Sequence, residues 1–309
     1  MISFARLLFR RIALLIALLA AVFVAMDLLP GKTARAVLGR DATPDRIAAK
    51  EHELGLDRPL PARFVAWISG VATGDFGRTA RGRSINELLA DKFPPTLLLG
   101  GVALALTVVA SLLLGAWWAA RTGGVARGVL QPATTVAAAV PEFVAATLLI
   151  MVFSLALGWL PAVTITGRSG LPASPEMLIL PVLALAIPQT GWNTRVVRAA
   201  LADAARSPHV ESAVLEGLPV RTVLLRHVLP FALPTIVASF ATTVGMLLGG
   251  SLVVETIFNY PGLGALLASS VADRDTALIA AVVALSGLVI MVMLAVADGI
   301  RAWSLRGRG

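Results

Sequence analysis

Residues 207–230 read SPHVESAVLEGLPVRTVLLRHVLP, and this polar stretch lies between two runs too apolar to be exposed to water. Ser207 can cap a helix whose first residue is Pro208, and Gly217 can end that helix in a left-handed turn. Pro219 can begin a second short helix, and the final proline marks a break before the next apolar run. We therefore expect a helix, a glycine elbow and a second helix. From the local pattern alone, an ordinary helical hairpin fits this segment as well as a surface for a partner protein.

The composition of the whole chain indicates a polytopic membrane protein. Of 309 residues, 57% are hydrophobic and 14% are charged, whereas soluble proteins average about 25% charged residues. The net charge of +8 does not indicate nucleic-acid binding, because the basic residues lie in short connections between apolar runs. There is no cysteine, and none of the three histidines lies in an apolar run, so we expect no metal site.

Six segments are long and apolar enough, or nearly so, to cross a bilayer, which takes about 20 residues. We therefore predict an all-α protein with six transmembrane helices. The first segment also resembles a signal peptide, because its uninterrupted apolar run is short and follows several arginines. The six segments are 8–29, 96–120, 129–157, 177–193, 231–254 and 277–297.

Basic residues in the short connections orient these spans. By the positive-inside rule, both termini and the 207–230 segment are expected in the cytoplasm. The long loop after the first span is expected outside, since long loops cross a membrane largely regardless of charge. The cytoplasmic side then carries Arg6, Arg10, Arg11, Arg121, Arg127, Arg195, Arg198, Arg206, Arg221, Arg226, Arg301, Arg306 and Arg308, and the opposite short connections carry Arg168 and Arg274.

These assignments divide the chain into three parts. Residues 1–30 are the N-terminal end and first span, 31–95 an extracytoplasmic helical loop, and 96–309 the remaining transmembrane domain with a cytoplasmic loop at 199–230. Within the external loop, capping signals predict a helix from Pro44 to about Gly55, another at 60–71 and a third after Ser84. These helices fit either a position along the membrane surface or a docking platform for an external protein.

Glu142 is a second candidate site, because it lies inside the third apolar run. On one continuous helix it would be about 18 Å along the axis from Leu130, near the middle of the membrane. A carboxylate at that depth is costly and is by default a functional hypothesis. Three roles remain open for it: a pathway group that favours cationic or amine-bearing solutes, an ion pair with a partner subunit, or a protonated packing residue.

Several motifs resemble one family of ATP-binding cassette (ABC) importer permeases, the dipeptide, oligopeptide and nickel family. VVETIFNYPGLG at 253–264 is similar to the segment that follows the fifth helix in that family, and Arg274-Asp275 is similar to its Arg-Asp pair before the sixth. LGLDRPLPARFVAWI at 54–68, GDFGRT at 74–79 and GWLP at 158–161 also match. The resemblance to its E-A-A…G…L-P coupling loop is carried by Glu211, Ser212, Ala213, Gly217, Leu229 and Pro230.

The resemblance implies a type I importer permease fold in a bacterial inner membrane, and a B-type subunit, which has the long external loop. It implies three protein partners: a C-type permease, ABC ATPase subunits and an extracytoplasmic substrate-binding protein. ATP and Mg²⁺ would be bound by the ATPase, so no cofactor and no catalytic residue is expected in this chain. Relatives commonly carry basic residues where Glu211, Val214 and Glu216 stand, which leaves the identity of the ATPase open.

Two other classes of function were weighed. A secondary, ion-coupled transporter often has internally repeated halves, and no such repeat is evident. An intramembrane enzyme would need motifs such as HExxH or GxSxG, which the sequence lacks. The chain also lacks the G-x-x-x-x-G-K-[ST] loop of ATPases, so ATP hydrolysis would belong to a separate chain. The transported solute, whether peptide, chelated metal or another small molecule, is not determined by these motifs.

Overall fold

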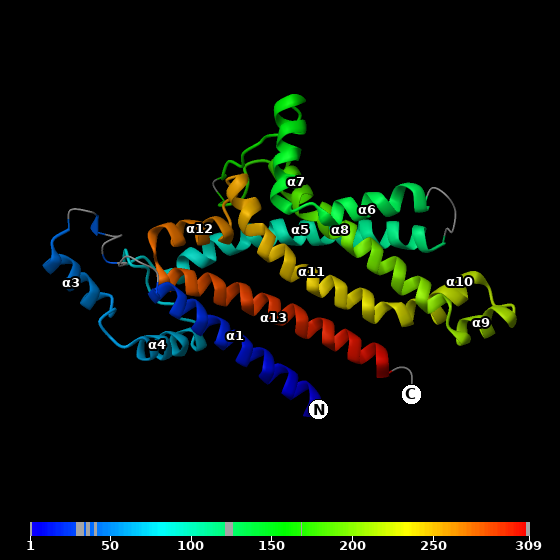
Figure 1. Ribbon diagram of the computed structural model, residues 1–309, viewed down its shortest axis with the longest axis horizontal. Coiled ribbons are helices and arrows are strands. Elements are labelled where there is room, and N and C mark those ends of the chain that lie inside the picture. The colour runs from blue at the N-terminus through cyan, green and yellow to red at the C-terminus, as the bar shows by residue number, and fades with distance from the viewer. Residues whose placement is uncertain are drawn as a thin grey trace. The chain divides into compact units, whose positions relative to one another are not determined.

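The computed structural model describes residues 2–28, 34, 38–39, 42–120, 126–167 and 169–306 (Figure 1). The prediction of an all-α protein is confirmed, because the only β structure in these ranges is two isolated bridges. Arg121, Arg168 and Arg308 lie outside the described residues, as do the side chains of Arg6, Arg127, Arg301 and Arg306.

Helices follow one another along the chain, and the connection between residues 156 and 176 is longer than most. The first part contains α1 (Ile2–Leu28), α3 (Pro44–Glu53), α4 (Leu60–Ala72) and α5 (Ile85–Ala120). The middle contains the π-helix η1 (Ala126–Leu130), α6 (Gln131–Ala139), α7 (Glu142–Leu149), the π-helix η2 (Ile150–Ala156) and α8 (Glu176–Ala205). The last part contains α9 (Pro208–Leu215), α10 (Val220–Thr222), the π-helix η3 (Val223–Val228), α11 (Leu229–Ile257), α12 (Leu263–Asp273) and α13 (Thr276–Arg306).

Among the described residues, four helices are long and apolar enough to cross a membrane, and there are up to five spans if one bent pair is counted as a span. The four lie within α1, α5, the continuous run from α10 to α11, and α13. The predicted fourth span, 177–193, falls in α8, which is not among these candidates by length and composition. The predicted span itself includes the polar residues Gln189, Thr190 and Asn193, which lower its hydropathy, and Arg195, Arg198 and Asp203 follow it in α8. The count of six spans is compatible with this arrangement but stays a prediction.

The predicted third span is not one straight helix. Residues 128–139 and 142–156 are bent by 104° at the break between α6 and α7. Val140 has extended backbone, and Pro141 precedes α7 in an extended conformation too, so the helix cannot continue through them. The continuous helix expected through Glu142 was therefore wrong, because Glu142 is the first residue of a new helix. Its depth in the membrane stays a prediction.

The chain forms two compact units, and the first contains Met1–Thr96, Arg168–Leu171 and Pro261–Met291. Here α1 packs against α4 through a cluster of three aromatic side chains, in which the ring centroids of Phe23 lie 5.4 Å from Phe64 and 5.2 Å from Trp67. Helices α3 and α4, the first two predicted within residues 31–95, are present at the positions predicted for them. The third also starts after Ser84, as expected, but it is no separate helix, because α5 continues through Pro94 and Pro95 for 36 residues.

The second unit contains Leu97–Gly167, Pro172–Tyr260 and Val292–Gly309. Its central element is α8, which packs against α6, α7 and α11 (Figure 1). Close approach between α8 and α6 depends on Gly191, where an added Cβ would lie 2.7 Å from the backbone of Thr134 and Ala138. The core includes Leu99, Ala103, Ala146, Leu180, Val182, Ala184, Leu185, Leu247, Val254, Phe258 and Tyr260.

Candidate functional site

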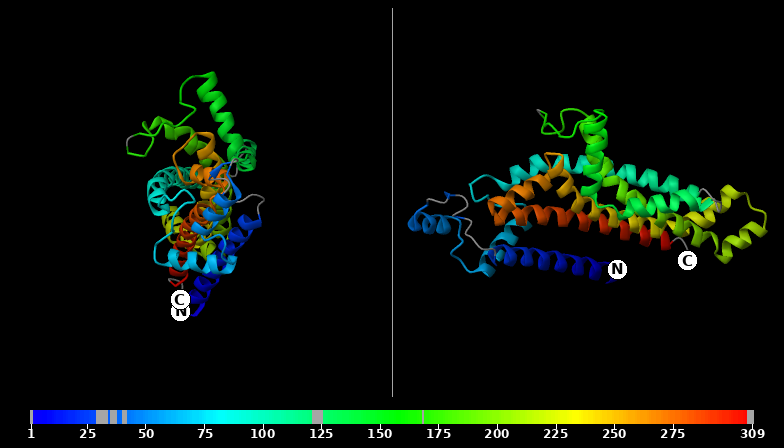
Figure 2. Two further views of the ribbon diagram at one scale, coloured as in Figure 1. Left: turned by 90° about the vertical axis from the view of Figure 1, so that its left-hand side faces the viewer. Right: turned by 45° about the horizontal axis from the view of Figure 1, so that its top comes forward.

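The 207–230 segment forms the predicted helix and elbow at one end of α8 and α11 (yellow-green in Figure 2). Helix α9 begins at Pro208, directly after Ser207, and buries Val210 and Ala213. These two side chains belong to a cluster with residues of α8, η3 and α11, namely Val197, Ala200, Leu201, Val223, Val228, Ala232 and Ile236. The apolar cluster holds α9 against the helices that precede and follow it.

The opposite face of α9 is exposed. Glu211 and Ser212 are both exposed, so two of the candidate coupling residues are available to a partner, whereas Ala213 packs inward. Two apolar side chains stand beside them, with Leu215 81% and Val214 58% exposed. Large exposed apolar side chains gathered on one helix face and rimmed by polar residues are typical of an interaction surface. We call Glu211, Ser212, Val214 and Leu215 the α9 face.

Gly217 forms the predicted elbow. Its φ is +75°, in the left-handed region that favours glycine. The N–H of Gly217 donates to the carbonyl of Val214, and the N–H of Leu218 donates to that of Ala213, at 3.0 and 3.2 Å. An added Cβ would meet no atom within 4 Å, so backbone conformation rather than space is what selects glycine here.

The second half of the segment differs from the prediction. We expected Pro230 to break the chain before the fifth span, but α10, η3 and α11 run continuously from Val220 to Ile257. The π-helix η3 ends just before Leu229 and Pro230, where a wider turn relieves the clash between a proline ring and the preceding turn. Both residues are half-buried, and they therefore join the elbow rigidly to α11.

His209 makes a hydrogen bond within this segment. Its Nε2 donates to the backbone carbonyl of His227 at 3.0 Å and lies 3.3 Å from the Ser207 hydroxyl. Its ring also packs on Phe231, with 4.1 Å between the ring centroids. No role was predicted for His209 from the sequence, although a histidine in the first turn of a predicted helix is a recognisable polar signal.

In the first unit, the Arg-Asp pair before α13 has a structural role. Arg274 has a φ of +55° and ends α12, while Asp275 caps α13 by accepting the Leu278 N–H at 3.1 Å. Its other oxygen accepts the N–H of Ala80 at 2.7 Å, and Arg81 pairs with Asp273 at 3.0 Å. Burial raises the pKa of the Asp275 carboxyl above its ordinary value, although both N–H donors oppose the shift.

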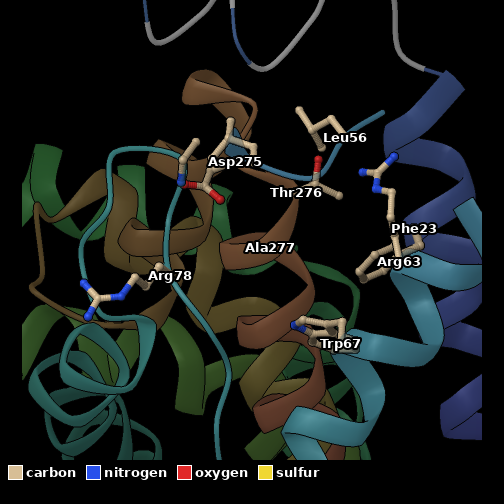
Figure 3. Close-up of a pocket in the computed structure, with 10 residues that line it drawn as sticks. Phe23, Leu56, Arg63, Trp67, Arg78, Asp275, Thr276 and Ala277 are labelled. Atoms are coloured by element: carbon tan, nitrogen blue, oxygen red, sulfur yellow. The ribbon is translucent and has the colours of Figure 1, made fainter. Parts of the chain in front are cut away.

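Beside Asp275 lies a cavity of about 160 Å³. Figure 3 shows Phe23 of α1 and Arg63 and Trp67 of α4 on one side of it, with Asp275 and Ala277 on the other. Trp67 Nε1 is buried without a hydrogen-bond partner among the described residues. The VVETIFNYPGLG motif reaches the same unit, where the Thr96 hydroxyl accepts the Leu263 N–H at 2.7 Å. The end of this motif thus contacts the first residue of the predicted second span.

Glu142 lies against α8 and α11 in the second unit. The amide nitrogen of Gln189 donates to Glu142 Oε1 at 3.4 Å, and Gly250 leaves room for the Glu142 side chain. Further along α8, Asn193 binds Thr243 at 2.8 Å and Ser239 at 2.7 Å. Gln189 was not singled out from the sequence, because an uncharged amide in an apolar run carries a weaker signal than a carboxylate. Within the described residues, no group of three or more His, Cys, Asp or Glu side chains could hold a metal ion.

Comparison with solved structures shows which class of protein has this fold. The chain resembles a crystal structure of an amino acid ABC transporter with histidines, with a TM-score of 0.55 and 18% identity over 70% of this chain and 94% of that one. It also resembles an inward-facing MetNI methionine ABC transporter, with a TM-score of 0.57 and 17% identity over 70% of this chain and 96% of the other. This is the fold of the membrane permease of an ABC importer.

The chain belongs to the family described as "Binding-protein-dependent transport system inner membrane component", whose profile matches residues 111–308. The N-terminal profile of the same family matches residues 1–99. A probable peptide ABC transporter permease protein, y4tP of Sinorhizobium fredii, is 31% identical over 93% of this chain and 94% of its own length. The glutathione transport system permease protein GsiC of Salmonella choleraesuis is 34% identical, covering 90% and 89%.

Family membership defines the activity at a coarse level. The chain is a multi-pass inner-membrane permease subunit of an ABC importer, and not an enzyme, since the ATPase of such systems is a separate chain. Such a permease works with another permease, an ATPase and a binding protein. The alternative of a secondary transporter is not supported.

Proposed function

We propose that this permease imports peptides or a related small solute, and that its 207–230 segment couples the pathway to a separate ATPase. The observation that carries the coupling role is the α9 face, which is exposed and partly apolar while the other side of α9 is anchored in the core. The peptide and glutathione functions named for its relatives support the substrate class.

Each candidate coupling residue has a distinct task in this proposal. Glu211 and Ser212 contact the ATPase, and Ala213 lets α9 lie close to α8. Gly217 sets the angle between α9 and η3, and Leu229 with Pro230 transmits movement into α11. A short helix fixed at a set angle can move its attached spans as a lever.

The partners are the ones that the family pattern implies. A C-type permease would complete the pathway as a heterodimer, and an extracytoplasmic binding protein would deliver the solute. The ATPase would hold ATP and Mg²⁺, with no cofactor bound by this chain. Both termini and the α9 face would lie in the cytoplasm, with the 31–95 loop on the outer side of a bacterial inner membrane.

Cross-linking tests the coupling contact directly, because the chain has no cysteine of its own. Leu215→Cys on the α9 face should form a cross-link to the ATPase in membranes, using a short thiol-to-amine reagent. Val163→Cys, an exposed apolar position in the loop after η2, is the matched control and should not. Equal cross-linking from both positions, or none from Leu215→Cys, would contradict the proposed contact.

A further inference from the structure

A carboxylate and an amide meet where three helices of the second unit come together. Glu142 begins α7 directly after the break at Pro141, Gln189 lies in α8, and Gly250 lies in α11. A Cβ added at Gly250 would lie 3.2–3.3 Å from the Glu142 side chain. Glycine at this position therefore allows the carboxylate to lie between α8 and α11.

Around Glu142 and Gln189 there are more hydrogen-bond acceptors than donors. The Gln189 amide is 3.4 Å from Glu142 Oε1, which is longer than the usual N–H···O distance of about 2.9–3.0 Å. Among the described residues, Glu142 has no salt-bridge partner. Gln189 is only 5% exposed, yet its Oε1 has no donor among those residues. One carboxylate and one amide oxygen thus retain unused acceptor capacity.

Asn193, the nearest amide along α8, does not share this deficit. Asn193, one helical turn further along α8, donates to the Gln189 carbonyl and to Thr243, and accepts from Ser239, at 2.7–2.8 Å. Such satisfied contacts between helices are ordinary packing in a membrane protein. Asn193 therefore makes a structural polar contact, whereas Gln189 belongs to a site that lacks a hydrogen-bond donor.

We propose that Glu142 and Gln189 form a binding site for the ammonium group, or a similar N–H-bearing cationic group, of the transported solute. This inference rests on the proposed import function and specifies its substrate class. An ammonium supplies three donors and one positive charge, which matches a carboxylate and an amide oxygen. A bare divalent metal would find fewer protein ligands here than it normally takes, since the described residues supply one carboxylate and one amide.

Two other occupants would satisfy the same acceptors. A proton on Glu142 would neutralise the carboxylate, and a basic side chain of the partner permease would pair with it. Either would remove the negative charge that attracts a cationic solute. The experiment must therefore detect whether Glu142 presents its charge to the aqueous pathway.

The absence of cysteine in this chain permits a charge-sensitive labelling measurement. A single Gly249→Cys substitution places a thiol next to Gly250, and an added Cβ there meets no atom within 4 Å. In membranes with the partner subunits present, the modification rates would be measured with a cationic trimethylammonium methanethiosulfonate and with neutral methyl methanethiosulfonate. The ratio of the two rates reports the local concentration of cations.

We expect the cationic-to-neutral ratio to fall about tenfold when Glu142→Gln is added, because one nearby negative charge is lost. Methylammonium should slow the modification at constant ionic strength when Glu142 is present, and Gln189→Leu should weaken that protection while keeping the charge. Glu176→Gln is the matched control, since it removes an exposed carboxylate at the start of α8 and should leave the ratio unchanged.

An unchanged ratio in Glu142→Gln, or no modification of Gly249→Cys at all, would overturn the site. The first result would mean a protonated or partner-paired Glu142, and the second a site without access from water. The measurement requires no ATP hydrolysis. Failure of the proposed function would show instead as the absence of an ATPase from the purified complex, so the two failures are distinguishable.

Discussion

His209 on α9 donates a hydrogen bond from Nε2 to the backbone carbonyl of His227 on η3, across 3.0 Å. The bond joins α9 to η3, the two helical parts of the 207–230 segment on either side of the elbow at Gly217. Because the acceptor is a main-chain oxygen, this hydrogen bond depends on the imidazole of His209 and not on the side chain of His227. It keeps α9 at a fixed angle to the helix that continues into α11.

His209→Phe should loosen the coupling segment without unfolding it. The ring contact with Phe231 would be kept while one hydrogen bond, worth about 0.5–1.5 kcal/mol net, is lost. We expect the solute transported per ATP hydrolysed to fall a few-fold in the reconstituted transporter. His227→Gln keeps the carbonyl and should behave as the unaltered chain does. Similar losses in both variants would show that the His209 bond has no role in coupling.

Leu215→Ser should weaken binding of the ATPase. The side chain is 81% exposed, so the substitution costs the isolated chain little stability, but a buried apolar contact would be lost in the complex. Interface truncations of this kind typically cost about 1–2 kcal/mol, or roughly tenfold in affinity. Titration of the detergent-solubilised permease with ATPase measures the loss. Val163→Ser is the control, and an affinity loss shared by both variants would argue against the α9 face.

Glu211→Lys should reduce coupling through the charge of the same face. Glu211 lies in the first turn of α9, where a negative charge is favoured by the helix dipole. Lysine replaces the negative charge with a positive one, which is unfavourable for the helix dipole and changes the contact with the ATPase. Glu211→Gln only removes the negative charge. We expect ATP-driven uptake in the order glutamate, glutamine, lysine, with membrane insertion unchanged. Equal uptake in all three would exclude an electrostatic contact at this position.

Asp275→Ala should destabilise the first unit, because both the α13 cap and the bond to the Ala80 N–H are lost. Loss of such a cap costs about 0.5–2 kcal/mol. Asp275→Asn keeps a capping oxygen and should cost less. Thermal unfolding in detergent at a fixed pH measures both changes, and an alanine variant as stable as the unaltered chain would contradict the capping role.

The same residue predicts a dependence of stability on pH. Since the folded-state pKa of Asp275 is raised, the folded chain holds its proton more tightly than the unfolded chain. Its contribution to stability is present below the ordinary pKa of 3.8 and is lost as pH rises through the folded value. Above pH 4, the stability of Asp275→Asn should fall less steeply with rising pH than that of the unaltered chain. If the stability of both proteins falls equally, other groups cause the decline.

Local signals predicted much of this fold because they act over one or two turns. The helix that starts after Ser207, the left-handed elbow at Gly217 and the helix that starts after Ser84 all follow from the chemistry of neighbouring residues. The predicted side-chain cap at Ser207 was wrong, because its hydroxyl donates to the Ala204 carbonyl and makes no capping bond. Prolines were harder to interpret. Pro230 was expected to break the chain, and the helix after Ser84 was expected to end before the second span. Pro94, Pro95 and Pro230 each lie within a continuous run instead, because helix packing and π-helical turns can compensate for a missing N–H.

Contacts between distant residues could not be predicted from the sequence. Glu142 was recognisable as an unusual charge, but its neighbour Gln189 is 47 positions away and Gly250 lies on a third helix. The bend at Val140 and Pro141 was not predicted either, and a depth counted along one straight helix assumes that no break exists. The motif at 253–264 likewise indicated similarity to a family, but it did not predict that the Leu263 N–H would donate to the Thr96 hydroxyl.

The most direct test of the coupling account is the ratio of solute imported to ATP hydrolysed by a reconstituted transporter that carries Gly217→Val. The solute would be the one that its binding protein retains. Since φ at Gly217 is +75°, valine would strain the elbow by about 1–3 kcal/mol, whereas Gly217→Asn tolerates this conformation and is the matched control. We predict a ratio lowered roughly tenfold for valine, near normal for asparagine, with the ATPase still bound. An unchanged ratio in Gly217→Val would contradict the claim that this segment transmits the work of ATP hydrolysis.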